Sequence, residues 1–229
     1  MTAMVARGRL TDLAYQHVRE GILRGELPIG SILDESDLAR TLGTSRTPVR
    51  QALGRLLQEG LIEIGSRRQA TVRGFSAEHR AEILLLREAL EGLAVRRACE
   101  LMEVDQIDRL RLLLIQQRRS AKNADNEEFI ELDEQFHLTI AEGAQLPILH
   151  AFLGQLRGFV RVARLGSARP PSVLATVVAE HERIVDALER RDASAAAAAL
   201  TKHLHKSDYA IAPSKRGRRT AELVPRSAR

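Results

Sequence analysis

The sequence predicts a mainly α-helical protein, in which an N-terminal winged helix-turn-helix is followed by an all-α antiparallel bundle of about six helices. Apolar residues recur at the spacing of helices that pack on one face along almost the whole chain. A short β-hairpin is expected only between residues 61 and 72. We expect domains over residues 1–75 and 76–212, and a basic, disordered tail over residues 213–229.

The composition argues against a membrane or secreted protein. Of the 229 residues, 44% are hydrophobic and 28% charged. No apolar run approaches the roughly 18 residues of a membrane span, and the N-terminus has no apolar secretory segment. The single cysteine, Cys99, rules out an internal disulfide and fits a reducing compartment. We therefore expect a cytoplasmic protein.

Charge is unevenly distributed along the chain. Residues 1–75 hold 11 Lys/Arg against 8 Asp/Glu, a net charge of +3. Residues 76–212 hold 18 against 21, a net charge of −3, and residues 213–229 hold 6 against 1, a net charge of +5. A basic N-terminal part next to an acidic middle part indicates that the first binds a polyanion.

Three helices and a hairpin make up the predicted N-terminal domain. Residues 10–24 form a helix that Gly25 ends, and residues 36–42 form a second helix that Gly43 ends. A third helix begins at Arg46 and is closed by Gly60, with Ser45 as its N-cap. The hairpin then has a polar tip over residues 65–69.

Helical periodicity takes over after a linker formed by Gly74, Phe75 and Ser76. We expect helices over residues 77–101, 105–122, 126–142, 147–165, 172–190 and 192–210. The expected N-caps are Ser76, Asp105, Asp125, Ser172 and Asp192, and Pro147, Pro170 and Pro171 fall at the breaks.

The third helix carries the predicted DNA-reading residues. Arg46 and Arg50 are four residues apart, so they share a face, which lies opposite the apolar stripe. At the start of a recognition helix such arginines can bond guanine in the major groove. The alternative is that they form a solvated face. Hydroxyls for phosphates come from Thr44, Ser45 and Thr47, and Arg67, Arg68 and Gln69 at the hairpin tip could enter the adjacent minor groove.

The run from Glu35 to Leu53, ESDLARTLGTSRTPVRQAL, closely resembles the DNA-binding domain of the GntR family of bacterial regulators. The likeness covers about residues 10–73. In two places the chain departs from the family pattern. Ser36 stands where some relatives have a DNA-contacting arginine, and Gln69-Ala70 replaces a more glycine-rich wing.

Four polar residues of the second domain occupy positions where the helical period predicts core. Asp133 and His137 are neighbours one turn apart, and His181 and His203 lie on the apolar stripes of two later helices. Burying an unpaired polar group costs about 1–3 kcal/mol, so the four side chains need a shared partner. Each histidine alone is more simply a core imidazole bonded to a backbone carbonyl. Together the four predict a divalent metal site, with zinc first and nickel, manganese, cobalt or iron also suitable.

The same residues resemble the FCD ligand-binding domain of the FadR-like GntR subfamily, and six helices resemble its shorter, VanR-like branch. The resemblance implies a small organic acid beside the metal, and a homodimer whose DNA binding responds to that acid. Arg87 also lies on a core stripe, where its guanidinium could bind the carboxylate of the effector. A salt bridge to one of the bundle's own acids is an equal alternative for Arg87.

These features predict a ligand-responsive, sequence-specific DNA-binding transcription regulator, a repressor acting as a homodimer on a palindromic operator of double-stranded DNA. We predict no enzymatic activity. One alternative is a metalloenzyme bundle fused to a DNA-binding head, because an open metal position can activate water. Another is a regulator with a purely structural metal site. Ligand-dependent release of DNA would distinguish the ligand-responsive regulator from a regulator with a purely structural metal site.

Overall fold

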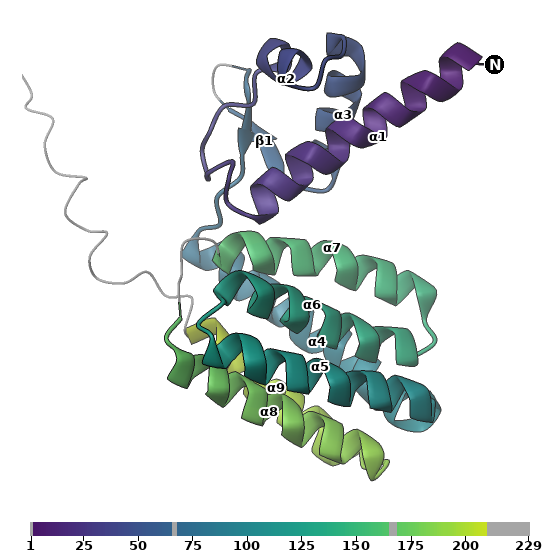
Figure 1. Ribbon diagram of the computed structural model, residues 1–229. Coiled ribbons are helices and arrows are strands. Elements are labelled where there is room, and N and C mark those ends of the chain that lie inside the picture. The colour runs from purple at the N-terminus through teal and green to yellow at the C-terminus, as the bar shows by residue number, and fades with distance from the viewer. Residues whose placement is uncertain (1, 66–67, 165–168, 210–229) are drawn as a thin grey trace, which may run out of the picture.

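The protein folds into two stacked parts, seen in a computed structural model that describes residues 2–65, 68–164 and 169–209 (Figure 1). Three helices and a hairpin form a small head, and α4 to α9 form a larger bundle below it, with α7 nearest to the head. Both predicted architectures are confirmed. No helix in these ranges is long and apolar enough to cross a membrane.

The head is a winged helix-turn-helix. Its two strands pair antiparallel, with Ile62 opposite Val72 and Ile64 opposite Ala70. Its core is built from α1 and α3, where Val18 and Leu56 are fully buried. The elements are α1 (Thr2–Leu23), α2 (Glu35–Thr41), α3 (Arg46–Gln58), β1 (Ile62–Ile64) and β2 (Ala70–Val72).

Short polar and glycine signals set the ends of these helices. Helix α2 begins at Glu35, one residue earlier than predicted, because the Asp34 side chain caps it by accepting hydrogen bonds from the backbone of Ser36 and Asp37. Gly43 and Gly60 follow α2 and α3 with φ of 60° and 74°, a conformation that glycine adopts without steric cost. These ends fix the tight turn that presents the N-terminus of α3.

The bundle has six helices in its described residues, as predicted. Helix α4 packs on α9, α9 on α8, α8 on α5, and α5 on α6, while α7 packs on α4 and α6. Phe136 and Leu114 lie in its main core. The helices are α4 (Ala77–Leu101), α5 (Val104–Lys122), α6 (Asn126–Gly143), α7 (Pro147–Arg164), α8 (Pro171–Glu189) and α9 (Ala193–Tyr209).

Two of the five caps predicted for the bundle are wrong. Helix α5 begins before Asp105, because Glu103 and Gln106 form a capping box ahead of it. Helix α8 begins before Ser172, because Pro171 suits a first turn that needs no backbone donor. The other three, Ser76, Asp125 and Asp192, accept backbone hydrogen bonds as predicted. The predicted helix ends at 165 and 210 and the tail lie outside the described residues.

Candidate functional site

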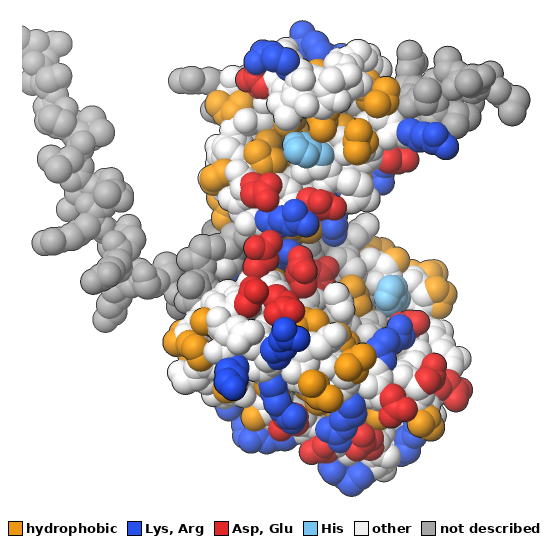
Figure 2. Space-filling view, in the orientation of Figure 1, with side chains coloured by type: hydrophobic (Ala, Val, Ile, Leu, Met, Phe, Trp, Pro, Cys, Tyr) orange, Lys and Arg blue, Asp and Glu red, His pale blue; other side chains and the backbone are white. Residues whose placement is uncertain are grey.

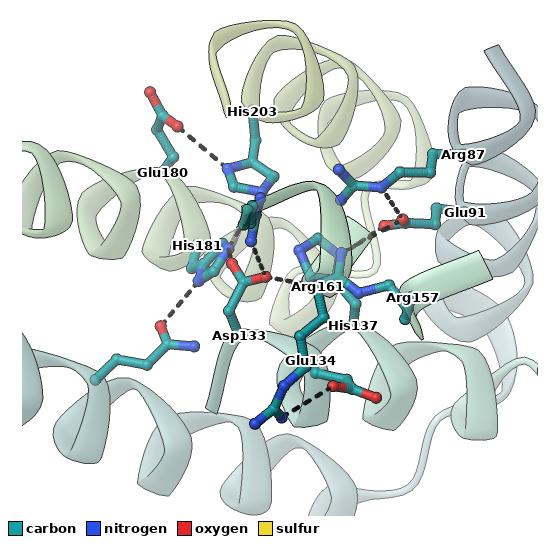
Figure 3. A network of polar contacts seen from close by, with 12 residues as sticks. Arg87, Glu91, Asp133, Glu134, His137, Arg157, Arg161, Glu180, His181 and His203 are labelled. Carbon is teal, nitrogen blue, oxygen red and sulfur yellow. Dashed lines mark hydrogen bonds and ion pairs between the residues drawn. The ribbon is translucent and has the colours of Figure 1, made fainter. Parts of the chain in front are cut away.

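The bundle brings the four predicted metal-ligating residues together at its centre. Asp133 and His137 come from α6, His181 from α8 and His203 from α9 (Figure 3). One ligand atom from each lies within 4.8 Å of the others. All four side chains are buried, with exposures of 1%, 4%, 0% and 0% in chain order. Helices separated by long stretches of sequence thus converge on one point.

Each imidazole is oriented by a partner outside this cluster. The Nδ1 atom of His137 lies 2.6 Å from the carboxylate of Glu91. The Nδ1 atom of His181 lies 2.8 Å from Oε1 of Gln117, and the Nδ1 atom of His203 lies 3.1 Å from the carboxylate of Glu180. Carboxylate and amide oxygens accept hydrogen bonds, so each ring carries its proton on Nδ1. The three Nε2 lone pairs therefore point inward, the arrangement that is usual for metal-ligating histidines.

The inward atoms have no adequate partner in the part of the chain that the structure describes. His137 Nε2 and Asp133 Oδ1 are buried without a hydrogen bond among the described residues. His181 Nε2 lies 3.3 Å from His203 Nε2, and 3.6 Å from Asp133 Oδ1. With their protons on Nδ1, these nitrogens face one another as two acceptors. Three nitrogens and one carboxylate oxygen fit a divalent cation, which would satisfy all four atoms at once.

The protonation states also suit a metal. Burial lowers the pKa of His137 to about 3 and the pKa values of His181 and His203 below their ordinary value, so the rings are neutral. Burial would raise the pKa of Asp133, but Arg164 and Arg157 outweigh it and hold that pKa well below its ordinary value. Asp133 is therefore an ionised carboxylate at neutral pH.

Arginines of α7 hold the other oxygen of Asp133, a feature that the sequence prediction missed. Oδ2 accepts from Arg157 and, at 2.8 Å, from Arg164 Nη1. Both arginines are buried, as is Arg161 between them. The signal was present, since Arg157, Arg161 and Arg164 recur at helical spacing on the face of Leu153. Arginine on an inward stripe indicates a buried anion.

Arg87 lies in the same buried region, but it is paired. Its Nε atom donates to Glu91 Oε1 at 2.7 Å, so the salt-bridge alternative is the one present. Burial lowers the pKa of Arg87 to about 10, which still leaves a cation at neutral pH. Its Nη2 atom is buried and has no hydrogen-bond partner among the residues that the structure describes. Glu91, which also orients His137, was missed because a lone Glu four residues from an Arg is common on helices.

This part of the bundle therefore has spare hydrogen-bond donors and positive charge. Within the described ranges, buried nitrogens on Arg87, Arg157 and Arg164 lack hydrogen bonds, and these three cations face two carboxylates, Glu91 and Asp133. A bound divalent ion would add to the positive excess. Uncompensated buried charge is costly, so the arrangement is suited to an anionic ligand.

The head presents the predicted DNA-reading arginines on its surface. The Arg46 and Arg50 side chains are 62% and 67% exposed, and both lie near Glu35 of α2. Arg50 makes two bonds to that carboxylate, Nε to Oε1 at 2.9 Å and Nη2 to Oε2 at 2.8 Å. The Arg46 guanidinium lies 3.7 Å from it. Glu35 thus orients Arg50, a role that sequence spacing did not reveal.

A cleft of about 500 Å³ lies between α3 and the wing, and Arg46 and Arg50 line it. Arg68 and Gln69 line this cleft and are exposed. Ser45 and Thr47 are exposed at the start of α3, whereas the Thr44 hydroxyl is buried and makes no hydrogen bond to a described residue. Arg67 lies outside the described residues. Figure 2 shows basic side chains, which are all Arg in residues 1–75, at the end of the head farthest from the bundle.

Comparison with known proteins agrees with both parts. The chain matches bacterial regulatory proteins of the gntR family over residues 10–72, and the FCD domain over residues 82–206. The HTH-type transcriptional repressor RspR of Escherichia coli (strain K12) is 29% identical over 200 residues, which is 86% of each chain. A probable D-xylose utilization operon transcriptional repressor of Paenarthrobacter nicotinovorans is 31% identical over 183 residues, 80% of each chain.

Solved structures show the same fold. E. coli McbR/YncC has a TM-score of 0.79 at 25% identity, with 88% of this chain and 96% of that chain covered. A putative GntR regulator from Rhodococcus sp. RHA1 has a TM-score of 0.76 at 22% identity, covering 89% and 97%. The chain thus belongs to the GntR family, with an FCD effector-binding domain consistent with the FadR-like, VanR-like branch, and it is a DNA-binding transcription regulator, not an enzyme.

Proposed function

We propose that this regulator is a repressor that binds a divalent metal at Asp133, His137, His181 and His203 and senses a small organic acid beside it. The observation that carries the proposal is that three Nε2 atoms and Asp133 Oδ1 converge within 4.8 Å while every Nδ1 is held from outside. Zinc suits this donor set best, and nickel, manganese, cobalt and iron also suit it. When bound, the metal supplies a Lewis-acidic charge that attracts carboxylate oxygens.

The proposed effector carries a carboxylate. Arg87 Nη2 and the unpaired nitrogens of Arg157 and Arg164 supply donors for it, and arginine matches carboxylate geometry with two parallel bonds. Such a ligand would offset the positive excess around Asp133. Two relatives are named transcriptional repressors, which favours repression for this chain.

The remaining parts of the proposal concern the assembly. We propose a homodimer that binds a palindromic operator with Arg46 and Arg50 in the major groove, and domain boundaries at residues 1–75 and 76–212. The ends of the two family matches, at 72 and 82, lie on either side of that boundary. The alternative is a regulator whose metal is purely structural. Release of DNA on adding the effector is expected for the proposed sensor and not for this alternative.

The metal proposal is tested with protein purified without an affinity tag. We expect about one metal ion per chain for the wild type by mass spectrometry, and loss of that metal in His181→Ala, because four-ligand sites rarely survive removal of one ligand. His17→Ala is the matched control, since His17 is exposed on the head. A wild type that takes up no zinc, nickel or manganese even when they are supplied would rule the site out.

Glu180→Gln tests the side chains that orient the proposed metal ligands. Glu180 orients His203, and such partners typically change metal affinity by about 10–100-fold, so we expect weaker zinc binding of that order with the fold intact. Competition with a chelator measures the affinity. Glu182→Gln, on the same helix but paired with Arg118, should leave it unchanged. Equal affinities for the two variants would contradict the role of Glu180.

Arg46→Ala tests base reading. We expect a loss of about 1–3 kcal/mol on an operator duplex and relaxed preference at one base pair. Arg68→Ala, at the wing, should weaken all sequences more evenly. Fluorescence anisotropy with operator and scrambled duplexes measures both. If Arg46→Ala lost as much affinity on scrambled DNA as on operator, its base-reading role would be refuted.

Arg87→Lys tests the effector site. A panel of small mono-, di- and tricarboxylates is screened for those that raise the melting temperature of the metal-loaded wild type. Lysine keeps the charge but lacks the two-pronged donor geometry, so we expect Arg87→Lys to lose most of that shift while retaining metal and DNA binding. Arg96→Lys, exposed on the same helix, is the control. An unchanged ligand-induced shift in Arg87→Lys would remove Arg87 from the effector site.

A further inference from the structure

Helix α7 is built into both parts of the molecule. On one side, Arg157 and Arg164 bond the Asp133 carboxylate at the centre of the bundle. On the other side, Val162 is fully buried in the core of the head, among residues of α1, α3 and the hairpin. A movement of α7 relative to α6 would therefore displace residues in the core of the head.

Arg161 links these two sides directly. Its Nε atom donates to the backbone oxygen of Leu23, the last residue of α1, at 3.0 Å. Its Nη2 atom donates to Glu131 Oε1 at 3.0 Å, and Nη1 lies 3.6 Å from Glu134 Oε2. Glu131 and Glu134 flank Asp133 in the α6 sequence. One guanidinium thus joins the metal-site helix to the end of a head helix.

The physical setting makes this contact stronger than an ordinary surface bond. Arg161 is only 8% exposed. The last carbonyls of a helix lack intrahelical donors and carry partial negative charge, so a buried cation there makes a charge-assisted bond. By contrast, the Arg24–Glu127 ion pair, another link between head and bundle, spans 3.8 Å between side chains that are 48% and 61% exposed. Exposed pairs of this kind contribute little.

We propose that Arg161 is the positioning residue through which the state of the Asp133 site sets the orientation of the DNA-binding head. The metal dependence of this proposal rests on the proposed function, whereas the hydrogen bond from Arg161 to Leu23 does not. If Asp133 coordinated an ion through Oδ1, its Oδ2 atom would accept less strongly from Arg157 and Arg164, and the packing of α7 on α6 would change. Arg161 and Val162 carry that change to the end of α1. The head orientations available to the protein then differ between the two states, which is the requirement for allosteric control.

The first experiment measures orientation and needs neither operator nor metal. In a Cys99→Ala background, spin labels are placed at Arg40, whose side chain is 77% exposed, and Val104, which is 73% exposed, and labelled protein is diluted with unlabelled protein. We expect Arg161→Met to broaden or shift the head-to-bundle distance distribution, with Arg161→Lys intermediate and Arg24→Met like the wild type. A distribution for folded Arg161→Met identical to that of the wild type would overturn the proposal.

The second experiment measures coupling. A duplex selected from a random library by the wild-type protein is titrated with and without Zn²⁺. We expect a zinc-dependent change in Kd of about 5-fold or more for the wild type and Arg24→Met, and little change for Arg161→Met, although that variant still binds zinc. A zinc response that survives in Arg161→Met would overturn the proposal. If the wild type itself bound no zinc, the proposed function would fail, and the distance measurement alone would decide the role of Arg161.

Discussion

The buried carboxylate of Asp133 is the point on which the rest of the bundle depends. With 1% exposure it cannot be solvated by water, so every part of its surroundings compensates its charge. Arg157 and Arg164 bond one oxygen, while the other faces three imidazoles. Removing any member would leave a buried charge or a buried donor without a partner. Helices α6, α7, α8 and α9 are therefore held in register by polar contacts as well as by apolar packing.

The arginines of the head, unlike those around Asp133, lie at the solvent-exposed surface. Its reading surface is exposed, and its arginines interact with Glu35 in a solvated setting where an ion pair contributes little to stability. The bidentate contact restricts the Arg50 guanidinium. Because this pair is solvated, breaking it would cost little free energy if Arg50 turned to DNA as proposed. A buried polar cluster and a solvated arginine surface thus coexist in one chain.

Helix α7 connects the head and the bundle physically. One face enters the bundle with Arg157 and Arg164, whereas Val162 is buried in the core of the head. Phe159 also packs on Phe75 of the linker, with ring centres 5.4 Å apart. Side chains of α7 thus belong to the core of the head and to a core of the bundle. The backbone oxygen at the end of α1 receives its hydrogen bond from this helix.

The sequence by itself determined the winged head, the six bundle helices and the four inward polar residues. Those features follow from local rules: helical period places Asp133 and His137 on one face, and glycines and caps end the helices of the head. Only the tertiary structure decided the partners. Glu91, Arg157 and Glu35 acquire their roles from side chains on other helices, and Arg161 meets Leu23 across 138 residues of sequence. Helical periodicity specifies which way a side chain faces, but the packing of helices decides what it meets there.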